Sequence, residues 1–124
     1  MNTRIDYLYR DAGNWKTHGS VVLAGPLTPE QITAMRRACE DGERFIASQV
    51  GLPDLQTLVA GAEGGFPTED DHVWSEFETI QATDEHPTLD LTASDFYQGF
   101  IGAAWDVTAA MERLGFTFLS FDLT

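Results

Sequence analysis

Carboxylates and an imidazole stand close together around residue 72, a combination that could bind a metal ion. Asp70 and Asp71 precede His72 directly, and Glu76 lies four residues further on. Carboxylate oxygens and an imidazole nitrogen are donors for Mg²⁺, Mn²⁺ or Zn²⁺. The spacing fits no established ligand motif, and the chain has one cysteine and no H-x-x-x-H pair. We therefore expect no metal, and keep Asp70, Asp71 and His72 as the residues that would hold one.

Nucleophilic and acid–base chemistry has little support in the sequence. Cys39 falls on the apolar stripe of an expected helix, where a buried and inert thiol is the usual interpretation. His18 and His86 have no catalytic partner at a defined spacing, and neither G-x-S-x-G nor a phosphate-binding glycine loop is present. We expect a non-catalytic protein without a cofactor. The alternative is an enzyme, or a small-ligand or metal binder, with its site in residues 61–76.

The acidic residues are strongly segregated along the chain. Between Arg44 and Arg113 there are 13 Asp and Glu and no Lys or Arg, whereas residues 1–44 hold six residues of each sign. The whole net charge of −13 therefore arises in that one stretch. Such segregation favours a surface that attracts a basic protein and repels nucleic acid and anionic membranes, although a merely solubilising role would give the same pattern.

The sharpest part of this stretch predicts a partner-binding face. On a strand, Glu76 and Glu78 would lie roughly 7 Å apart on one side. That pitch is close to two phosphate steps along one DNA strand, so a carboxylate row could occupy a groove built for a nucleic-acid backbone. Trp74 would share that face as an anchor. The expected contact residues are Glu69, Asp70, Asp71, Trp74, Glu76, Glu78, Asp84 and Glu85.

Periodicity predicts an α+β fold in one domain, residues 1–124. Strands at 4–10 and 17–24 form a hairpin around a turn at residues 11–14. A helix begins at Pro29, capped by Thr28 with Gln31 completing a capping box, and runs to about Asp41. A short strand at 45–50, a long loop at 54–71, a strand at 73–83, a helix from about Thr92 to Gly115 and a closing strand at 116–121 follow. Two helices then pack on a mostly antiparallel sheet of four to five strands, in the order ββα(β)βαβ.

Composition bounds the class of protein. A chain of 124 residues with 43% hydrophobic residues can build a core of its own. A single cysteine and an N-terminus without an apolar run predict a cytoplasmic protein. The longest weakly charged stretch is too short to cross a bilayer. The oligomeric state has no signature in the sequence.

Three segments resemble a family of small, mostly uncharacterised bacterial proteins: residues 7–16, 45–56 and 71–77. Members of that family often have His where this chain has Ser75. The resemblance implies a compact bacterial-type domain and carries no activity with it. The sequence as a whole favours an acidic inhibitor that blocks a basic surface, possible settings being a phage counter-defence protein or the immunity protein of a toxin.

Overall fold

The N-terminal hairpin forms as its alternating pattern predicts. In the computed structural model, which describes residues 1–59 and 66–116, β1 (Asn2–Arg10) pairs antiparallel with β2 (Lys16–Leu23). Ile5, Tyr7 and Tyr9 alternate along β1 and are all buried. Asn14 closes the turn with a positive φ of 66°, a conformation that asparagine tolerates better than most residues.

A four-stranded antiparallel sheet carries the described part of the fold, in the order β2-β1-β4-β3. The long strand β4 (Ser75–Thr83) pairs with β1, and the two-residue strand β3 (Arg44–Phe45) pairs with the start of β4. The register along β4 slips by one residue opposite the Asp6–Tyr7 step, which leaves Glu78 as the extra residue of a bulge. The strands predicted at 4–10, 17–24 and 73–83 are therefore confirmed to within two residues at each end.

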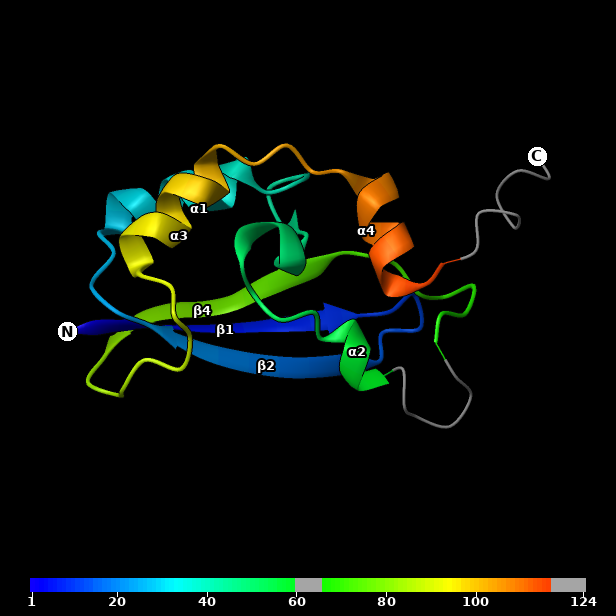
Figure 1. Ribbon diagram of the computed structural model, residues 1–124, viewed down its shortest axis with the longest axis horizontal. Helices are drawn as coiled ribbons and strands as arrows, with labels where there is room; N and C mark the ends of the chain where they lie inside the picture. Colours follow the sequence, from blue (N-terminus) through cyan, green and yellow to red (C-terminus); the bar gives the residue numbers. More distant parts are fainter. Residues whose placement is uncertain (60–65, 117–124) are drawn as a thin grey trace.

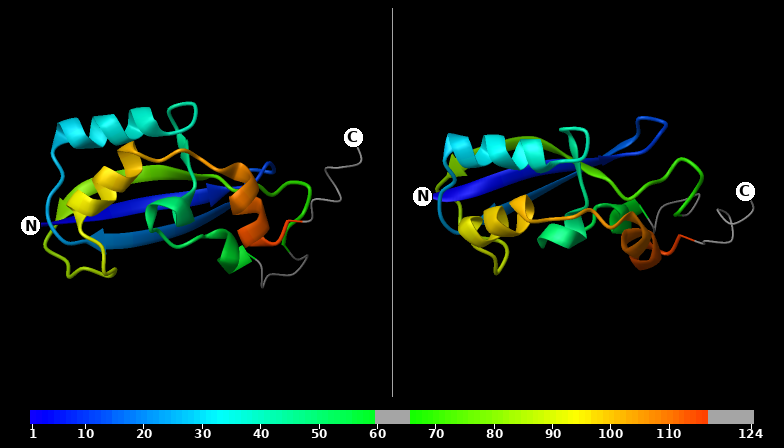
Figure 2. Two further views of the ribbon diagram at one scale, coloured as in Figure 1. Left: turned by 45° about the horizontal axis from the view of Figure 1, so that its top comes forward. Right: turned by 90° about the horizontal axis from the view of Figure 1, so that it is seen from above.

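Two helices cover one face of this sheet. Helix α1 (Pro29–Ala38) begins at the predicted capping box, where the Thr28 side chain accepts from the Gln31 amide and the Gln31 side chain accepts from the Thr28 amide. Helix α3 (Ala93–Ile101) lies beside α1 on the same side of the sheet (Figures 1 and 2). Helix α1 ends three residues earlier than predicted, because Cys39 turns to extended backbone.

Three predicted elements differ from the structure. The long helix expected from Thr92 to Gly115 is two helices, α3 and α4 (Val107–Leu114), because Asp106 caps a new helix by accepting from the Ala109 amide. The strand expected at 45–50 is β3 followed by the 3₁₀ helix η1 (Ala47–Val50). The expected long loop contains the short helix α2 (Gln56–Val59). Most of the closing strand expected at 116–121 lies outside the described residues.

Aromatic side chains fill the space between the sheet and the helices. Phe100 of α3 is fully buried, and its ring lies within 6 Å of four other rings, those of Phe45, Phe77, Phe96 and Trp105. A Cβ at Gly19 of β2 would lie 2.4 Å from a methyl carbon of Leu55, so a larger residue there would force the Leu55 side chain to shift. The result is an α+β fold with one helix-covered face and one polar face. None of the helices in the described ranges has the length and apolarity that a membrane crossing needs.

Candidate functional site

His72 is held by the backbone on both of its ring nitrogens. Its Nε2 lies 2.6 Å from the carbonyl oxygen of Arg10, and its Nδ1 lies 3.0 Å from the amide nitrogen of Trp74. Since the Trp74 amide can only donate, Nδ1 accepts and Nε2 carries the proton that it donates to Arg10. Burial lowers the pKa of His72, and the bond to the Arg10 carbonyl opposes that shift only in part. The neutral ring thus links the hairpin to the segment that leads into β4 through these two hydrogen bonds.

Asp71 has a structural role as well. One of its carboxylate oxygens accepts from the Tyr9 hydroxyl, and the other accepts from the amide (2.8 Å) and the hydroxyl (3.1 Å) of Thr68. Asp71 and His72, two of the three residues considered as metal ligands, therefore form hydrogen bonds that hold the loop in place. In residues 1–59 and 66–116, no group of three or more His, Cys, Asp or Glu is placed to hold a metal ion. Asp71 was also predicted to contact a partner; in the structure its carboxylate bonds to Tyr9 and Thr68 and fixes the shape of the loop.

The neutral state of His72 predicts a pH dependence of stability. Its folded pKa lies below the ordinary value of 6.5, so its contribution is complete above pH 6.5 and is lost as the pH falls through 6.5 toward the folded pKa. His72→Asn keeps an acceptor near the Trp74 amide but does not titrate. We expect the unfolding free energy of the wild type to fall relative to this variant between about pH 7 and about pH 5.

Urea titrations at several pH values measure this difference. His86→Asn is the matched control, because it makes the same replacement at an exposed histidine. Equal pH slopes for the wild type and His72→Asn would show that His72 is not the group responsible.

The acidic residues of β4 are paired with side chains of the N-terminal hairpin. Glu76 lies 3.2 Å from Arg10, and Glu78 lies 2.7 Å from His18. Just after β4, Glu85 lies 2.8 Å from Arg4. Exposed pairs of this kind add little stability, but the two arginine pairs cancel charge. The expectation of a free carboxylate row along this strand is therefore wrong, because β4 lies alongside the strand that carries Arg4 and Arg10.

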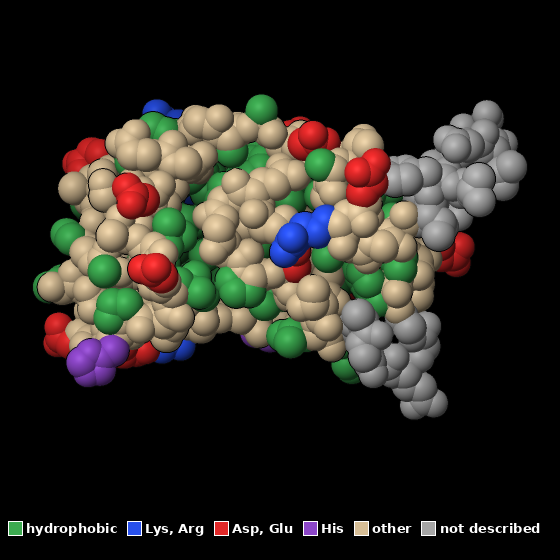
Figure 3. All heavy atoms as spheres, in the orientation of Figure 1, with side chains coloured by type: hydrophobic (Ala, Val, Ile, Leu, Met, Phe, Trp, Pro, Cys, Tyr) green, Lys and Arg blue, Asp and Glu red, His purple; other side chains and the backbone are tan. Residues whose placement is uncertain are grey.

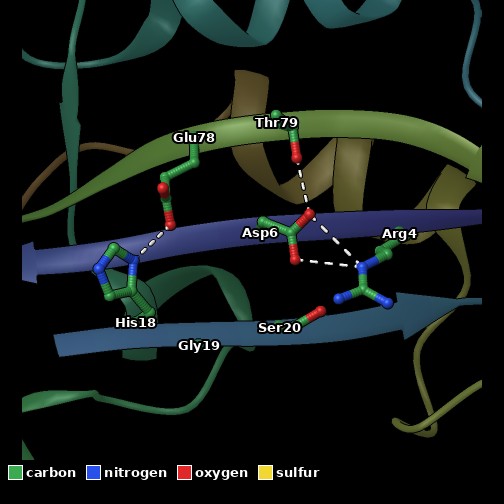
Figure 4. Close-up of a pocket in the computed structure, with 7 residues that line it drawn as sticks. All are labelled: Arg4, Asp6, His18, Gly19, Ser20, Glu78 and Thr79. Atoms are coloured by element: carbon green, nitrogen blue, oxygen red, sulfur yellow. Dashed lines mark hydrogen bonds and ion pairs between the residues drawn. The ribbon is translucent and has the colours of Figure 1, made fainter.

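The pair of His18 and Glu78 and the pair of Arg4 and Asp6 line a shallow hollow on the polar face of the sheet (Figure 4). It has a volume of about 440 Å³. Asp6 lies at its centre, where its carboxylate accepts from Arg4 (3.1 Å) and from the Thr79 hydroxyl (2.7 Å). Burial alone would raise the pKa of Asp6, but hydrogen bonds from Thr79, Ser20 and Arg4 lower it. The hollow is polar and of mixed charge, with its acidic groups already paired.

Trp74 does not provide the exposed anchor that the sequence suggested. It is half-buried and packs in a second apolar cluster with Ile46, Val73 and Ala110. A small hollow of about 220 Å³ lies beside it, between the segment entering β4 and helix α4. It is lined by Asp71, His72, Val73, Trp74, Val107, Met111 and Phe116. Because α4 packs over this segment, the indole is drawn toward the interior.

Trp15 is the exposed tryptophan instead. It ends the hairpin turn with 74% of its surface accessible, and its amide donates to Asp11 Oδ1 at 2.9 Å. The Ala12 amide donates to the Asp70 carbonyl at 3.0 Å, which ties the turn to the acidic loop. We call residues 11–15 and 68–71 together the hairpin end. Glu69 and Asp70 are exposed there, and no cation of the described chain lies within ion-pair distance of either.

The predicted contact residues therefore separate into two groups. Glu69, Asp70 and Asp71 lie at the hairpin end, whereas Asp84 and Glu85 follow the opposite end of β4, where Thr83 pairs with Asn2. Acidic side chains stand singly over the face shown in Figure 3, separated by apolar and uncharged surface. On the face shown, the acids therefore do not form one continuous patch. Trp15 was missed, although a tryptophan directly after an Asp-Ala-Gly-Asn turn was a visible signal.

Cys39 is buried, as its place on the apolar stripe predicts. Burial raises the pKa of its thiol to about 11, so the thiolate is scarce at neutral pH. Its Sγ lies 3.5 Å from the carbonyl oxygen of Met35, one turn earlier. This cysteine is a packing residue of α1.

Comparison of the chain with protein-family models, curated proteins and solved structures finds no match. Only the geometry therefore bears on function.

Proposed function

We propose that this protein is a non-catalytic binding module that engages a basic surface of another protein through the hairpin end. One observation carries the proposal: Trp15 is 74% exposed beside a loop whose Glu69 and Asp70 have no described cation near them. Tryptophan dominates the energetic centres of protein interfaces, and exposing so large an apolar side chain gains nothing for an isolated domain. An exposed apolar side chain on a turn that is bonded to an acidic loop fits a partner with a groove bordered by Lys or Arg.

The rigidity of the loop supports this interpretation. Asp71 and His72 fix residues 68–74 through bonds to Tyr9, Thr68, Arg10 and Trp74. A loop that is already ordered loses little conformational entropy when it binds, so more of the contact energy appears as affinity. Binding there would cover the basic surface of the partner, which is how an inhibitor of the predicted kind would act. The net charge of −13 would steer the encounter.

A charge-reversal pair tests the proposal. Glu69→Lys with Asp70→Lys changes the hairpin end, whereas Glu30→Lys with Asp95→Lys makes the same change of net charge on the exposed starts of α1 and α3. Each form is immobilised, exposed to a lysate of the native host at low salt and eluted with a salt gradient. We expect the wild type and the α1/α3 variant to retain the same basic protein, and the hairpin-end variant to lose more than about tenfold in affinity.

Salt provides the second criterion. Binding that depends on exposed carboxylates weakens as the ionic strength rises. Equal loss of binding in both charge-reversal variants would show that only net charge matters. Retention that is unaffected by salt, or by the hairpin-end substitutions, would refute the proposed site.

A further inference from the structure

Among the described residues, a stretch of the outer edge of β2 next to the hairpin end has no backbone partner. Strand β2 is the last strand on its side of the sheet. Near its C-terminal end the edge is covered, since the Thr88 amide donates to the Val22 carbonyl at 2.8 Å and the Val22 amide donates to the Thr88 hydroxyl at 2.9 Å. Val22 therefore directs both of its backbone groups away from β1.

The register extends this orientation along the strand. The pairing of β1 with β2 runs without a bulge from Thr3↔Leu23 to Arg10↔Lys16. In an antiparallel ladder every second residue faces outward, so His18 and Ser20 share the orientation of Val22. In the part of the chain that the structure describes, no backbone hydrogen bond outside the ladder reaches either residue. Both are exposed, so the N–H and C=O groups of His18 and Ser20 form a template for one more strand.

From this edge we infer that the partner adds an extended, basic segment to β2 at residues 16–20, so that main-chain bonds complement the anchor at Trp15. This inference rests on the proposed function and describes how the same interface is extended. The edge runs directly into Trp15, and the hollow bordering it contains the carboxylates of Asp6 and Glu78 (Figure 4). Strand addition draws affinity from the backbone and specificity from alternate side chains.

Two kinds of strand could pair with the β2 edge, one from a second copy of this chain and one from a basic partner, and their charges distinguish them. A second copy of this chain could pair with β2 in the same way, but each copy carries a net charge of −13 and would repel the other. A lysine-rich strand from another protein meets an attractive overall field, because the net charge of this chain is −13. The occupant that fits is therefore an extended basic peptide.

Substitution at Ser20 isolates the backbone contribution. Ser20→Pro removes the outward N–H while leaving the ladder to β1 intact, and proline is tolerated at edge positions whose N–H faces solvent. Ser20→Ala keeps the N–H and is the matched control. The probe is a short fluorescent peptide of alternating lysine and threonine, and the same peptide with glutamate in place of lysine controls for charge.

We expect the lysine peptide to bind the wild type and Ser20→Ala equally, and to bind Ser20→Pro at least about tenfold more weakly. The glutamate peptide should bind none of them. Amide hydrogen exchange on the wild type gives a readout independent of the proline variant: the lysine peptide should slow exchange at His18 and Ser20 but not at the inward-facing Thr17.

Unchanged exchange at His18 and Ser20, or equal affinity for Ser20→Pro and Ser20→Ala, would overturn strand addition. If that happens while capture of the native partner still depends on Glu69 and Asp70, the proposed function stands and only the edge is excluded. If peptide binding depends on Ser20 while capture ignores Glu69 and Asp70, the edge is a binding site but the hairpin end is not.

Discussion

Replacing Trp15 with alanine is expected to weaken binding of the captured partner about thirtyfold, which corresponds to the ~2 kcal/mol typical of an interface hot spot. The indole is 74% exposed in the free protein, so its full apolar surface is available for burial by a partner. For the same reason the free protein should lose less than about 0.5 kcal/mol of unfolding free energy. Calorimetric titration with the captured partner, together with urea unfolding, measures the two effects separately.

The matched control for Trp15 is another exposed apolar residue at a different place. Ile101 lies at the end of α3 with 43% of its surface accessible. Ile101→Ala should leave the affinity unchanged. If Trp15→Ala binds as tightly as the wild type, or if Ile101→Ala loses as much affinity, the partner does not use the hairpin end as its anchor.

The largest expected effect on stability comes from Phe100. Phe100→Ala should cost about 3–5 kcal/mol of unfolding free energy, the range for truncating a buried phenylalanine. Its ring is fully buried and lies in contact range of Phe45 from β3, Phe77 from β4 and Trp105 from the segment after α3. The cavity would therefore open where sheet and helices meet. Since small domains are stable by about 5–15 kcal/mol in total, the variant would be close to unfolding.

Ile101→Ala is again the control, because it shortens the neighbouring side chain of the same helix on the exposed side. Its expected cost is below about 1 kcal/mol. Denaturant unfolding of the three forms gives the comparison. A loss of less than about 1.5 kcal/mol for Phe100→Ala would mean that the core closes around the gap or that Phe100 packs less centrally than its contacts indicate.

Local signals were enough for the features that neighbouring residues determine. The alternation of Ile5, Tyr7 and Tyr9 predicts β1, and the capping box of Thr28 and Gln31 predicts the start of α1, because the groups that decide both lie within a few residues. The break between α3 and α4 was missed. Trp105 and Val107 fit the apolar stripe of one long helix, but the Trp105 indole donates to the Ala38 carbonyl at 3.1 Å, a contact with α1 that no local window contains.

The wrong expectation of a free carboxylate row along β4 also arose from contacts between residues that are far apart in the sequence. Counting charges along the chain separates Glu76 and Glu78 from the basic residues of the first third. The sheet order β2-β1-β4 brings them together again, so that Arg10 neutralises Glu76 and His18 faces Glu78. The exposure of Trp15 is likewise a property of the assembled hairpin and loop. The composition indicated an acidic binding face, but the order of the strands decides which carboxylates acquire an ion-pair partner.

The most direct measurement is hydrogen exchange of the complex with the captured partner, compared with the free protein. A binding site at the hairpin end predicts slower exchange in residues 11–15 and 68–71, with the amides of α1 and α3 unchanged. Protection confined to the helix-covered face, with residues 11–15 and 68–71 exchanging as in the free protein, would contradict it.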